Sequence, residues 1–275
     1  MSSQLNRAID ILELVQGSAQ PLPLAEIARK LDLPKAAAHR LLQAWVARGY
    51  IEQEPIAQRY AATLKLAIIG FGHLAVTGLR DVCLPELRRL ADETGELARL
   101  AVVDHDTLTW VMEAQGAREG LRYDGNMGRQ AILHATAAGK AWLATLSDDE
   151  ALRRVLNQGF RGPPETGPAA IRTVESLLAE LKSCRANGYT TAFDEASLGV
   201  SSVAAAIFAG VEPEAPCVGS VITVGPSARM TRERVVELAP TIRATAQRIS
   251  RLWPIRMHME TGTQRPTPLS TGGSV

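Results

Sequence analysis

Apolar residues near the start of the chain repeat with the period of an α-helix in three successive segments. Residues 24–31 and 38–45 carry them at i, i+3, i+4 and i+7, which predicts two amphipathic helices that bury against each other. Pro34 favours the first turn of the second of these helices, and Gly49 favours the residue after its last turn. An earlier stripe supplies a third wall for the same core and consists of Leu5, Ala8, Ile9, Leu12 and Val15.

After Gly49 the pattern changes to two short runs, residues 50–53 and 59–62, around a polar turn. Three helices followed by this hairpin predict a winged helix-turn-helix in residues 1–63. On the outward face of its third helix, basic side chains suit phosphates or guanine, a glutamine suits adenine, and alanines allow close approach to a base. The predicted DNA contacts are Lys35, Ala36, Ala37, His39, Arg40, Gln43 and, in the hairpin, Arg59. The alternative is a winged helix that contacts proteins.

The segment after the hairpin keeps a helical apolar stripe over residues 64–75 and resumes it over residues 82–90. A helix striped with aliphatic residues between two domains typically packs on a copy of itself or on the next domain, so we assign residues 64–80 to a linker and dimerisation helix. Residues 70–75 (GFGHLA) also match a dinucleotide fingerprint. That fingerprint requires a preceding strand, which this helical pattern does not supply, and we give it little weight.

Residues 81–254 mix β-rich runs with helical patterns, and we interpret them as one α+β domain with an antiparallel sheet and helices on one face. The chain is therefore a multi-domain α/β protein. Residues 255–275 are polar and of low complexity, which predicts a disordered tail. The expected strands are 97–103, 108–114, 189–192, 203–208 and 218–224, and the expected helices are 137–146, 148–157, 171–187 and 231–252.

The charge and the cysteine content of the chain indicate what it binds and where in the cell it is found. The 275-residue chain has a net charge of +1, whereas residues 22–65 carry seven Lys or Arg against four Asp or Glu, a local excess of +3. A small basic footprint suits a DNA-binding protein that uses two copies. Three widely spaced cysteines without CxxC spacing indicate a reducing, cytoplasmic location. We expect no membrane association, because no signal segment and no apolar run of about 18 residues is present.

Motifs for catalysis are missing from the sequence. It has no GxSxG, HExxH or Walker motif and no metal-spaced cluster among its five histidines and three cysteines. We therefore expect no enzyme activity, no metal and no cofactor. The alternatives are a small-molecule-processing enzyme, or a ligand-binding protein that uses its helix-turn-helix for protein contacts. Stoichiometric binding of a small molecule without turnover distinguishes a regulator from an enzyme.

Four short segments follow one another in the predicted helix-turn-helix: 24–29 (LAEIAR), 33–35 (LPK), 38–42 (AHRLL) and 48–50 (RGY). Together they resemble the DNA-binding domain of the IclR family of bacterial transcriptional regulators. Residues 133–141 (LHATAAGKA) are similar to the motif of its effector-binding domain, and 185–189, 198–205 and 225–226 are similar to later landmarks. The family usually has Ser-Thr at the positions of Ala36 and Ala37, so this chain lacks two hydroxyls that would bind phosphate.

The resemblance implies a transcriptional regulator, a repressor or an activator, whose C-terminal domain has a GAF-like or PAS-like fold. Its partners would be a near-palindromic double-stranded DNA operator, a small organic acid effector and further copies in a homodimer or homotetramer. From the residues alone, the small side chains after His134 are explained by close packing; the resemblance instead favours an effector contact. The implied effector residues are Leu121, Arg122, Ala131, His134, Ala137, Ala138, Ala192, Phe193, Asp194, Ser201, Ser202, Ile222 and Val224.

Two of these positions bear on the effector's chemistry. Ile222 and Val224 stand where the family often has serines, which makes that wall of the pocket apolar. The effector is therefore predicted to have a hydrophobic or aromatic body with an anionic end, for which Arg122 supplies a countercharge.

Overall fold

The computed structural model describes residues 3–160, 166–212 and 214–253, and the chain divides into two compact units, Met1–Val76 and Thr77–Val275. The boundary falls inside the segment that the sequence assigns to the linker. The predicted tail, residues 255–275, lies outside the described residues. No single described helix is both long and apolar enough to cross a membrane. Among the described helices, only α4 (Lys65–Thr77) and α5 (Leu79–Thr94) taken together reach that length and composition, and they are bent by 89° at the break between them.

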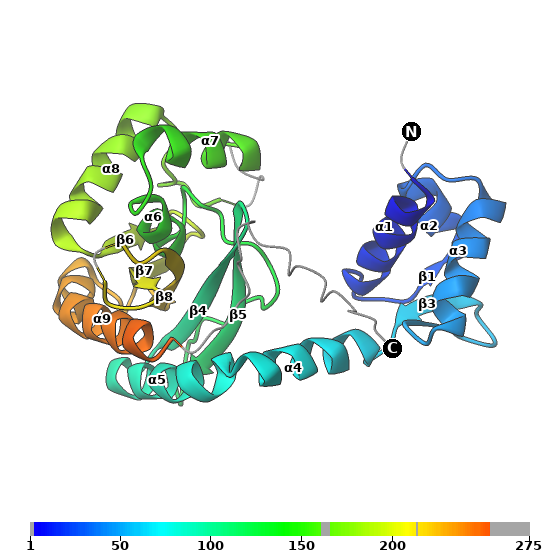
Figure 1. Cartoon of the computed structure of the whole chain (residues 1–275), viewed down its shortest axis with the longest axis horizontal. Coiled ribbons are helices and arrows are strands. Elements are labelled where there is room, and N and C mark those ends of the chain that lie inside the picture. Colours follow the sequence, from blue (N-terminus) through cyan, green and yellow to red (C-terminus); the bar gives the residue numbers. More distant parts are fainter. Residues whose placement is uncertain (1–2, 161–165, 213, 254–275) are drawn as a thin grey trace, which may run out of the picture. The chain divides into compact units, whose positions relative to one another are not determined.

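The first unit is a helix-turn-helix with a small sheet (Figure 1). Three helices come first, and two longer strands form the predicted hairpin. A two-residue strand, β1, adds to the hairpin in the order β1-β3-β2; it ends in proline and is too short to show a period in the sequence. The elements are α1 (Gln4–Gln16), β1 (Leu22–Pro23), α2 (Leu24–Lys30), α3 (Lys35–Ala47), β2 (Ile51–Gln53) and β3 (Arg59–Ala62).

The end of α3 is fixed by a glycine turn and by one tryptophan. Gly49 has φ = 72°, which only glycine adopts cheaply, and the turn lets Tyr50 N–H donate to the Trp45 carbonyl at 3.0 Å. The indole N–H of Trp45 donates to the Ala8 carbonyl at 2.8 Å, so it ties α3 to α1. These contacts hold α3 in a defined orientation within the unit, with its outward face free.

Helix α4 (Lys65–Thr77) follows and has no buried residue. Its apolar side chains are strongly exposed, including Ile68 at 67% and Phe71 at 61% of their full area. A row of exposed aliphatic and aromatic side chains on one helix is unusual for a surface that stays in contact with water.

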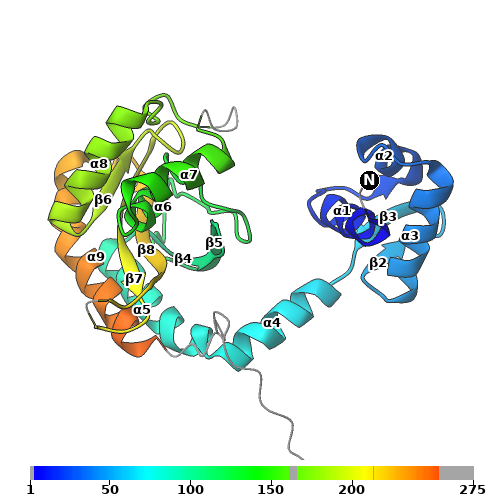
Figure 2. The same ribbon diagram turned by 45° about the horizontal axis from the view of Figure 1, so that its top comes forward.

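The second unit is a five-stranded antiparallel sheet with helices on both faces (Figures 1 and 2). Helices α5 and α9 cover one face, and α6 covers the other with α8 and α7 beside it. The strand order is β5-β4-β8-β7-β6. Its elements are α5 (Leu79–Thr94), β4 (Leu97–Asp104), β5 (Thr107–Gln115), α6 (Ala137–Leu143), α7 (Asp148–Gln158), α8 (Val174–Asn187), β6 (Thr190–Phe193), β7 (Val200–Phe208), β8 (Cys217–Pro226) and α9 (Arg232–Leu252).

The expectation of helices on one face only was wrong. The central strand β8 is buried without interruption from Gly219 to Pro226, because both of its faces are covered. An unbroken apolar or small-residue run is the sequence signature of such a strand. Three bounds differ from the expected ones by three residues: β7 begins at Val200 rather than 203, and α6 ends at Leu143 rather than 146. Helix α8 begins at Val174 rather than 171, and the Thr173 hydroxyl before it accepts a hydrogen bond from Ser176 N–H.

Candidate nucleic-acid interface and ligand pocket

The predicted DNA-reading residues lie on the outer side of the first unit. Five of them are exposed positions of α3, which the helical period places on one face: Lys35, Ala36, His39, Arg40 and Gln43. Ala37 is half-buried, and Arg59 is exposed at the start of β3. Within the described part of the chain, neither Lys35 nor Arg40 forms an ion pair, so both cations are available to an anionic partner.

Polar contacts connect this face of α3 to the hairpin. The Gln43 side chain lies 3.5 Å from His39 Nε2 and donates a long hydrogen bond, also 3.5 Å, to Gln53 of β2. Arg59 donates to the Pro21 carbonyl at 3.4 Å, which holds its guanidinium beside the base of the hairpin. Helix and hairpin therefore present one continuous polar surface with a basic character.

The second unit contains a pocket on the α6 face of its sheet. Its inner chamber has a volume of only about 30 Å³, enough for about two water molecules. The outer chamber, at about 490 Å³, has the size of a small-molecule site and shares several walls with the inner one. The shared residues are Arg99, Trp110, Tyr123, Thr136 and Ala196.

Arg99 of β4 is the charged group at the junction of the two chambers. Its residue is only 4% exposed, and its guanidinium lies 4.0 Å from the ring centroid of Trp110. Nη2 donates to the Asn126 carbonyl at 3.0 Å. Burial lowers the pKa of the guanidinium from its ordinary value, and the charges of Tyr123 and Glu113 oppose this shift. The group still carries its positive charge at neutral pH.

The Glu113 carboxylate compensates the charge of the Arg99 guanidinium only in part. Arg99 Nε and Glu113 Oε2 are 3.3 Å apart, within ion-pair range, yet both atoms are buried without an aligned hydrogen-bond partner in the described residues. Unpaired buried polar atoms are uncommon in folded proteins and call for a ligand, an ion or water. The arrangement can therefore accept an additional anionic oxygen at the guanidinium.

A β-bulge brings Trp110 under Arg99. Arg99 pairs with Glu113 across β4 and β5, and the register then shifts so that Ala101 pairs with Trp110. Because one residue of β5 is extra at this point, Glu113 and Trp110 lie on the same face although they are three positions apart. Gly125 closes the other side of the guanidinium: a Cβ there would lie 2.5 Å from Arg99 Cζ, so only glycine fits without displacement.

The structure brings five of the predicted effector residues to this pocket. Ala192, Ser202, Ile222 and Val224 line the inner chamber, and Ala131 lines the outer one. Four of them follow from sheet register, since Ala192 pairs with Ser202 and Ser202 with Val224, while Ile222 lies opposite Arg99. Opposite residues on neighbouring strands share a face.

The remaining predicted effector residues lie elsewhere. Arg122 is exposed and pairs with Asp124 at 3.2 Å, and Leu121 is exposed as well. The Phe193 ring lies under Arg232, Asp194 accepts a hydrogen bond from Gly199 N–H, and the Ser201 and Ser227 hydroxyls are bonded to each other. None of these five predicted residues lines either chamber.

The small residues of the 134–139 segment serve packing. Ala137 and Ala138 are fully buried in the core, and His134 stacks on Phe160 with its Nδ1 unpaired among the described residues. The Thr136 hydroxyl accepts a hydrogen bond from Gly139 N–H, so the start of α6 is capped by the chain itself. A Cβ on Gly139 would lie 2.4 Å from the Leu133 carbonyl oxygen, which explains the glycine.

A buried ion pair supports the loop above the pocket. Lys140 of α6 is 1% exposed, and its Nζ donates to both Glu195 oxygens at 2.8 and 2.9 Å and to Glu180 at 3.3 Å. Burial raises the pKa of the Glu195 carboxyl, and Lys140 opposes the rise. The residues after Glu195 line the pocket, so the pair anchors one of its walls. No cluster of acidic, His or Cys side chains suited to a metal ion occurs among the residues with described coordinates.

Sequence reasoning missed the groups that give the pocket its chemistry: Arg99, Trp110, Tyr123 and Thr136. A signal was present for Arg99, a lone cation inside an apolar strand, since buried charge in such a place is costly unless it has a purpose. No sequence signal marks the bulge that turns Trp110 toward it.

Comparisons with known proteins match almost the whole chain. The model of the IclR helix-turn-helix domain matches residues 4–55, and the model of the bacterial transcriptional regulator IclR C-terminal domain matches residues 71–251. The HTH-type transcriptional regulator BhcR of Paracoccus denitrificans is 30% identical over 90% of this chain and 85% of its own length. The HTH-type transcriptional repressor AllR of Escherichia coli K12 is 27% identical over 92% of this chain and 91% of its own.

One solved structure similar to this chain contains a ligand. It is an IclR homologue from Microbacterium hydrocarbonoxydans complexed with 4-hydroxybenzoate. Its TM-score is 0.70 at 22% identity, and the match covers 89% of this chain and 99% of that one. At this identity the likeness concerns the fold.

Proposed function

This chain belongs to the IclR family of bacterial transcriptional regulators, and we propose that it responds to an organic acid bound beside Arg99. As a member of the family it is a DNA-binding regulator with an effector-binding C-terminal domain, and it is not an enzyme. What is proposed is the class of effector, the residues that hold it and the assembly that reads DNA.

The buried guanidinium of Arg99 carries the proposal for an acid. It lies in a pocket whose other walls are mainly apolar, and its nearest carboxylate, Glu113, is not aligned for a hydrogen bond. A ligand carboxylate can form the charge-assisted bonds that Glu113 does not, which are roughly twice as strong as neutral ones. The effector would thus replace an imperfect ion pair with a better one, and Arg122 has no part in it.

The apolar walls carry the proposal for a hydrophobic or aromatic body. Ile222 and Val224 face the inner chamber, and Trp110 forms its aromatic wall. The Microbacterium homologue is described as a complex with 4-hydroxybenzoate, an aromatic acid, which supports this class without identifying the molecule. Because the inner chamber holds only about 30 Å³, Arg99 or the residues around Tyr123 must move for such a body to enter.

Calorimetric titration of the whole protein tests the effector class. Benzoate, 4-hydroxybenzoate, short aliphatic acids and hydrophilic keto acids are titrated in parallel, with benzamide as the uncharged match for benzoate. We expect the acids with an apolar body to bind and benzamide to bind at least tenfold more weakly, about 1.4 kcal/mol or more. Binding by small hydrophilic keto acids alone would refute the apolar part of the proposal.

Two matched variants distinguish Arg99 from Arg122, which the sequence predicted to be the countercharge of the effector's anionic group. Arg99→Gln removes the buried cation, whereas Arg122→Gln removes an exposed cation of the same type from the neighbouring loop. We expect acid binding to be lost in the first variant and kept in the second. The reverse result would restore Arg122 as the countercharge.

We also propose that the outer face of α3 enters the major groove. Its cations, Lys35 and Arg40, are free of ion pairs within the described chain, and Gln43 can reach a base edge. Ala36 and Ala37 would permit close approach rather than bind phosphate. Arg59 would contact the DNA backbone beside the hairpin. One helix-turn-helix with so few cationic contacts would bind DNA only weakly. Two copies would therefore bind together, on a near-palindromic operator.

We propose that the chain forms a homodimer through the exposed apolar side chains of α4. Two such dimers would combine into a homotetramer. Burial of a large apolar side chain contributes about 1.5–3 kcal/mol, and α4 exposes several of them. Ile68→Glu or Phe71→Glu should therefore weaken self-association, as measured by analytical ultracentrifugation. His73→Glu, a polar change on the same helix, is the control, and equal dissociation constants for all variants would remove α4 from the interface.

A further inference from the structure

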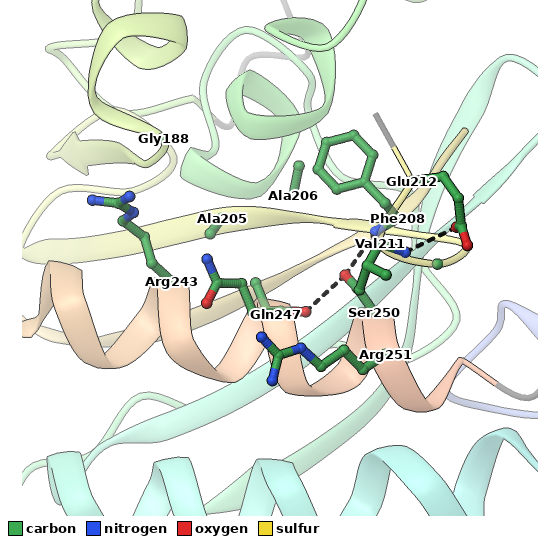
Figure 3. Close-up of a pocket in the computed structure, with 12 residues that line it drawn as sticks. Gly188, Ala205, Ala206, Phe208, Val211, Glu212, Arg243, Gln247, Ser250 and Arg251 are labelled. Carbon is green, nitrogen blue, oxygen red and sulfur yellow. Dashed lines mark hydrogen bonds between the residues drawn. The ribbon is translucent and has the colours of Figure 1, made fainter. Parts of the chain in front are cut away.

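A second groove, distinct from the Arg99 pocket, lies where α9 runs beside β7 (Figure 3). It has a volume of about 440 Å³ and lies on the face of the sheet that carries α9. Ala205, Ala206 and Phe208 line it along the edge of β7, with Gly188 at one end. Three long polar side chains of α9 border it: Arg243, Gln247 and Arg251.

The strand edge in this groove is open. β6 pairs with β7 only as far as Thr190 opposite Ala204, although β7 continues to Phe208. Val200 accepts a hydrogen bond from the β6 side, so by alternation the N–H and C=O groups of Ala206 point to the same edge, beyond the end of β6. At Phe208 the edge is closed again, because its N–H donates to the Ser250 hydroxyl at 2.9 Å.

The charge bordering this edge is unbalanced. Arg243 and Arg251 are exposed, and neither forms an ion pair within the ranges that the structure describes. By contrast, Arg234 and Arg248 of the same helix pair with Glu237 and Glu86. Glu212 is the groove's acidic residue, and its carboxylate accepts a hydrogen bond from Val211 N–H in the β7–β8 connection. The groove wall on α9 therefore favours an acidic partner.

We propose that this groove binds an extended acidic segment of another protein, whose backbone forms hydrogen bonds with the open N–H and C=O groups of Ala206 at the edge of β7. Addition of a strand satisfies edge N–H and C=O groups and is a common mode of peptide recognition. Arg243, Gln247 and Arg251 are four residues apart, a helical rise of about 6 Å per step. Alternate residues of a strand are spaced by about 6.6–6.8 Å, so side chains at i, i+2 and i+4 match the three positions.

This match specifies the sequence that the groove prefers. Carboxylates at i and i+4 would meet Arg243 and Arg251, and a polar side chain at i+2 would meet Gln247. The intervening residues would point to the other side of the sheet, where the Phe208 ring projects away from α9, and should be apolar (Figure 3). Glu212 disfavours any further carboxylate beyond one end of this segment.

The test uses the full-length protein and a fluorescein-labelled peptide containing Glu-Val-Gln-Val-Glu, followed by fluorescence anisotropy. We expect saturable binding that weakens with salt. Replacing either arginine, in Arg243→Gln or Arg251→Gln, should weaken it about fivefold, the upper range for one exposed ion pair. Arg234→Gln removes the same charge from α9 outside the groove and should leave binding unchanged.

Two altered peptides test the mode of binding without changing the protein. Glu→Gln at both ends removes the charges, and N-methylation of the central peptide groups removes the strand's donors. Either peptide binding as well as the parent would overturn the proposal, as would wild-type affinity in the Arg243→Gln, Arg251→Gln double variant. If instead this double variant alters sedimentation while no peptide binds, the groove joins copies of the chain and the proposal is wrong.

Discussion

The ion pair between Lys140 and Glu195 offers a quantitative test of the packing beneath the pocket. Lys140 Nζ is held by both oxygens of Glu195, and the lysine is almost completely buried. The substitution Glu195→Ala removes the carboxylate but leaves the ammonium group in the core. An uncompensated buried charge of this kind typically reduces the free energy of unfolding by about 3–5 kcal/mol.

The surroundings of Lys140 place this chain at the lower end of that range. Glu180 remains within 3.3 Å of Nζ, and its side chain is 32% exposed, so it can follow the ammonium group and admit water. We expect Glu195→Ala to lower the free energy of unfolding by about 3 kcal/mol. Glu195→Gln should lower it by about 2 kcal/mol, because an amide oxygen still accepts a hydrogen bond from the lysine.

Urea unfolding followed by tryptophan fluorescence measures these values. A Trp45→Phe background removes the signal of the first unit, so that Trp110, Trp142 and Trp253 report on the second. Glu237→Ala is the control: this exposed glutamate pairs with Arg234 at 3.3 Å, and its loss should change the free energy by at most about 0.5 kcal/mol.

A double variant distinguishes a buried charge from lost packing. Lys140→Met with Glu195→Leu removes both charges and keeps their volume, so it should destabilise less than Glu195→Ala alone. If Glu195→Ala costs no more than the exposed control, Lys140 is not dependent on Glu195 and the reasoning fails. The same loop carries Ala196 and Ser197 into the pocket, so effector affinity should fall together with stability.

Four further predictions concern other sites. Arg40→Ala should abolish retardation of operator DNA selected from genomic fragments while acid binding by the C-terminal domain is unchanged. Burial lowers the pKa of His134, so the stability it contributes is present above pH 6.5 and is lost as pH falls through its folded pKa; urea unfolding of His134→Gln should lack this dependence. Burial raises the pKa of Cys83 and Cys184 to about 12, so iodoacetamide should leave both unmodified until urea is added. Gly139→Ala should lower the free energy of unfolding by roughly 2 kcal/mol in the same urea assay, because the added methyl group would overpack the core against the Leu133 carbonyl.

Each of these has a result that contradicts it. Wild-type retardation by Arg40→Ala would remove that residue from the DNA contacts. Unchanged pH dependence in His134→Gln would show that another group titrates in that range. Rapid labelling of Cys184 in the native protein would mean that α8 opens readily. A Gly139→Ala protein as stable as the parent would show that the 133–139 turn can move apart.

The fold of the first unit, the helix-turn-helix, was predictable because the residues that determine it are close together in the sequence. Residues 24–31 and 38–45 carry a full helical period, and Gly49 ends α3 with the positive φ that the sequence requires. Residues that share a face of one strand were also predictable in the second unit. Ile222 and Val224 are two positions apart on β8, so their side chains point to the same face of the sheet. In both cases the pattern within one element contains the answer.

The charge of the pocket was not predictable in this way, because it depends on which strand lies beside which. The apolar strand around Arg99 marks that residue as unusual, but the pattern within the strand does not show that its guanidinium faces a pocket while Arg122 reaches solvent. That difference follows from β4 being placed between β5 and β8. Pairing across distant strands is non-local information, and a period within one strand cannot contain it.

The bulge in β5 is one feature that depends on the pairing between strands. Strict alternation from Glu113 would place residues 111 and 109 on the pocket face and turn Trp110 away. The extra residue reverses this order, so the aromatic wall and the cation meet only because the register shifts between Leu100 and Ala101. The apolar wall of the pocket is thus encoded by a regular pattern, whereas its affinity for an acid depends on an irregularity. A variant that restored regular pairing here would separate Trp110 from Arg99 and should lose the effector while keeping the fold.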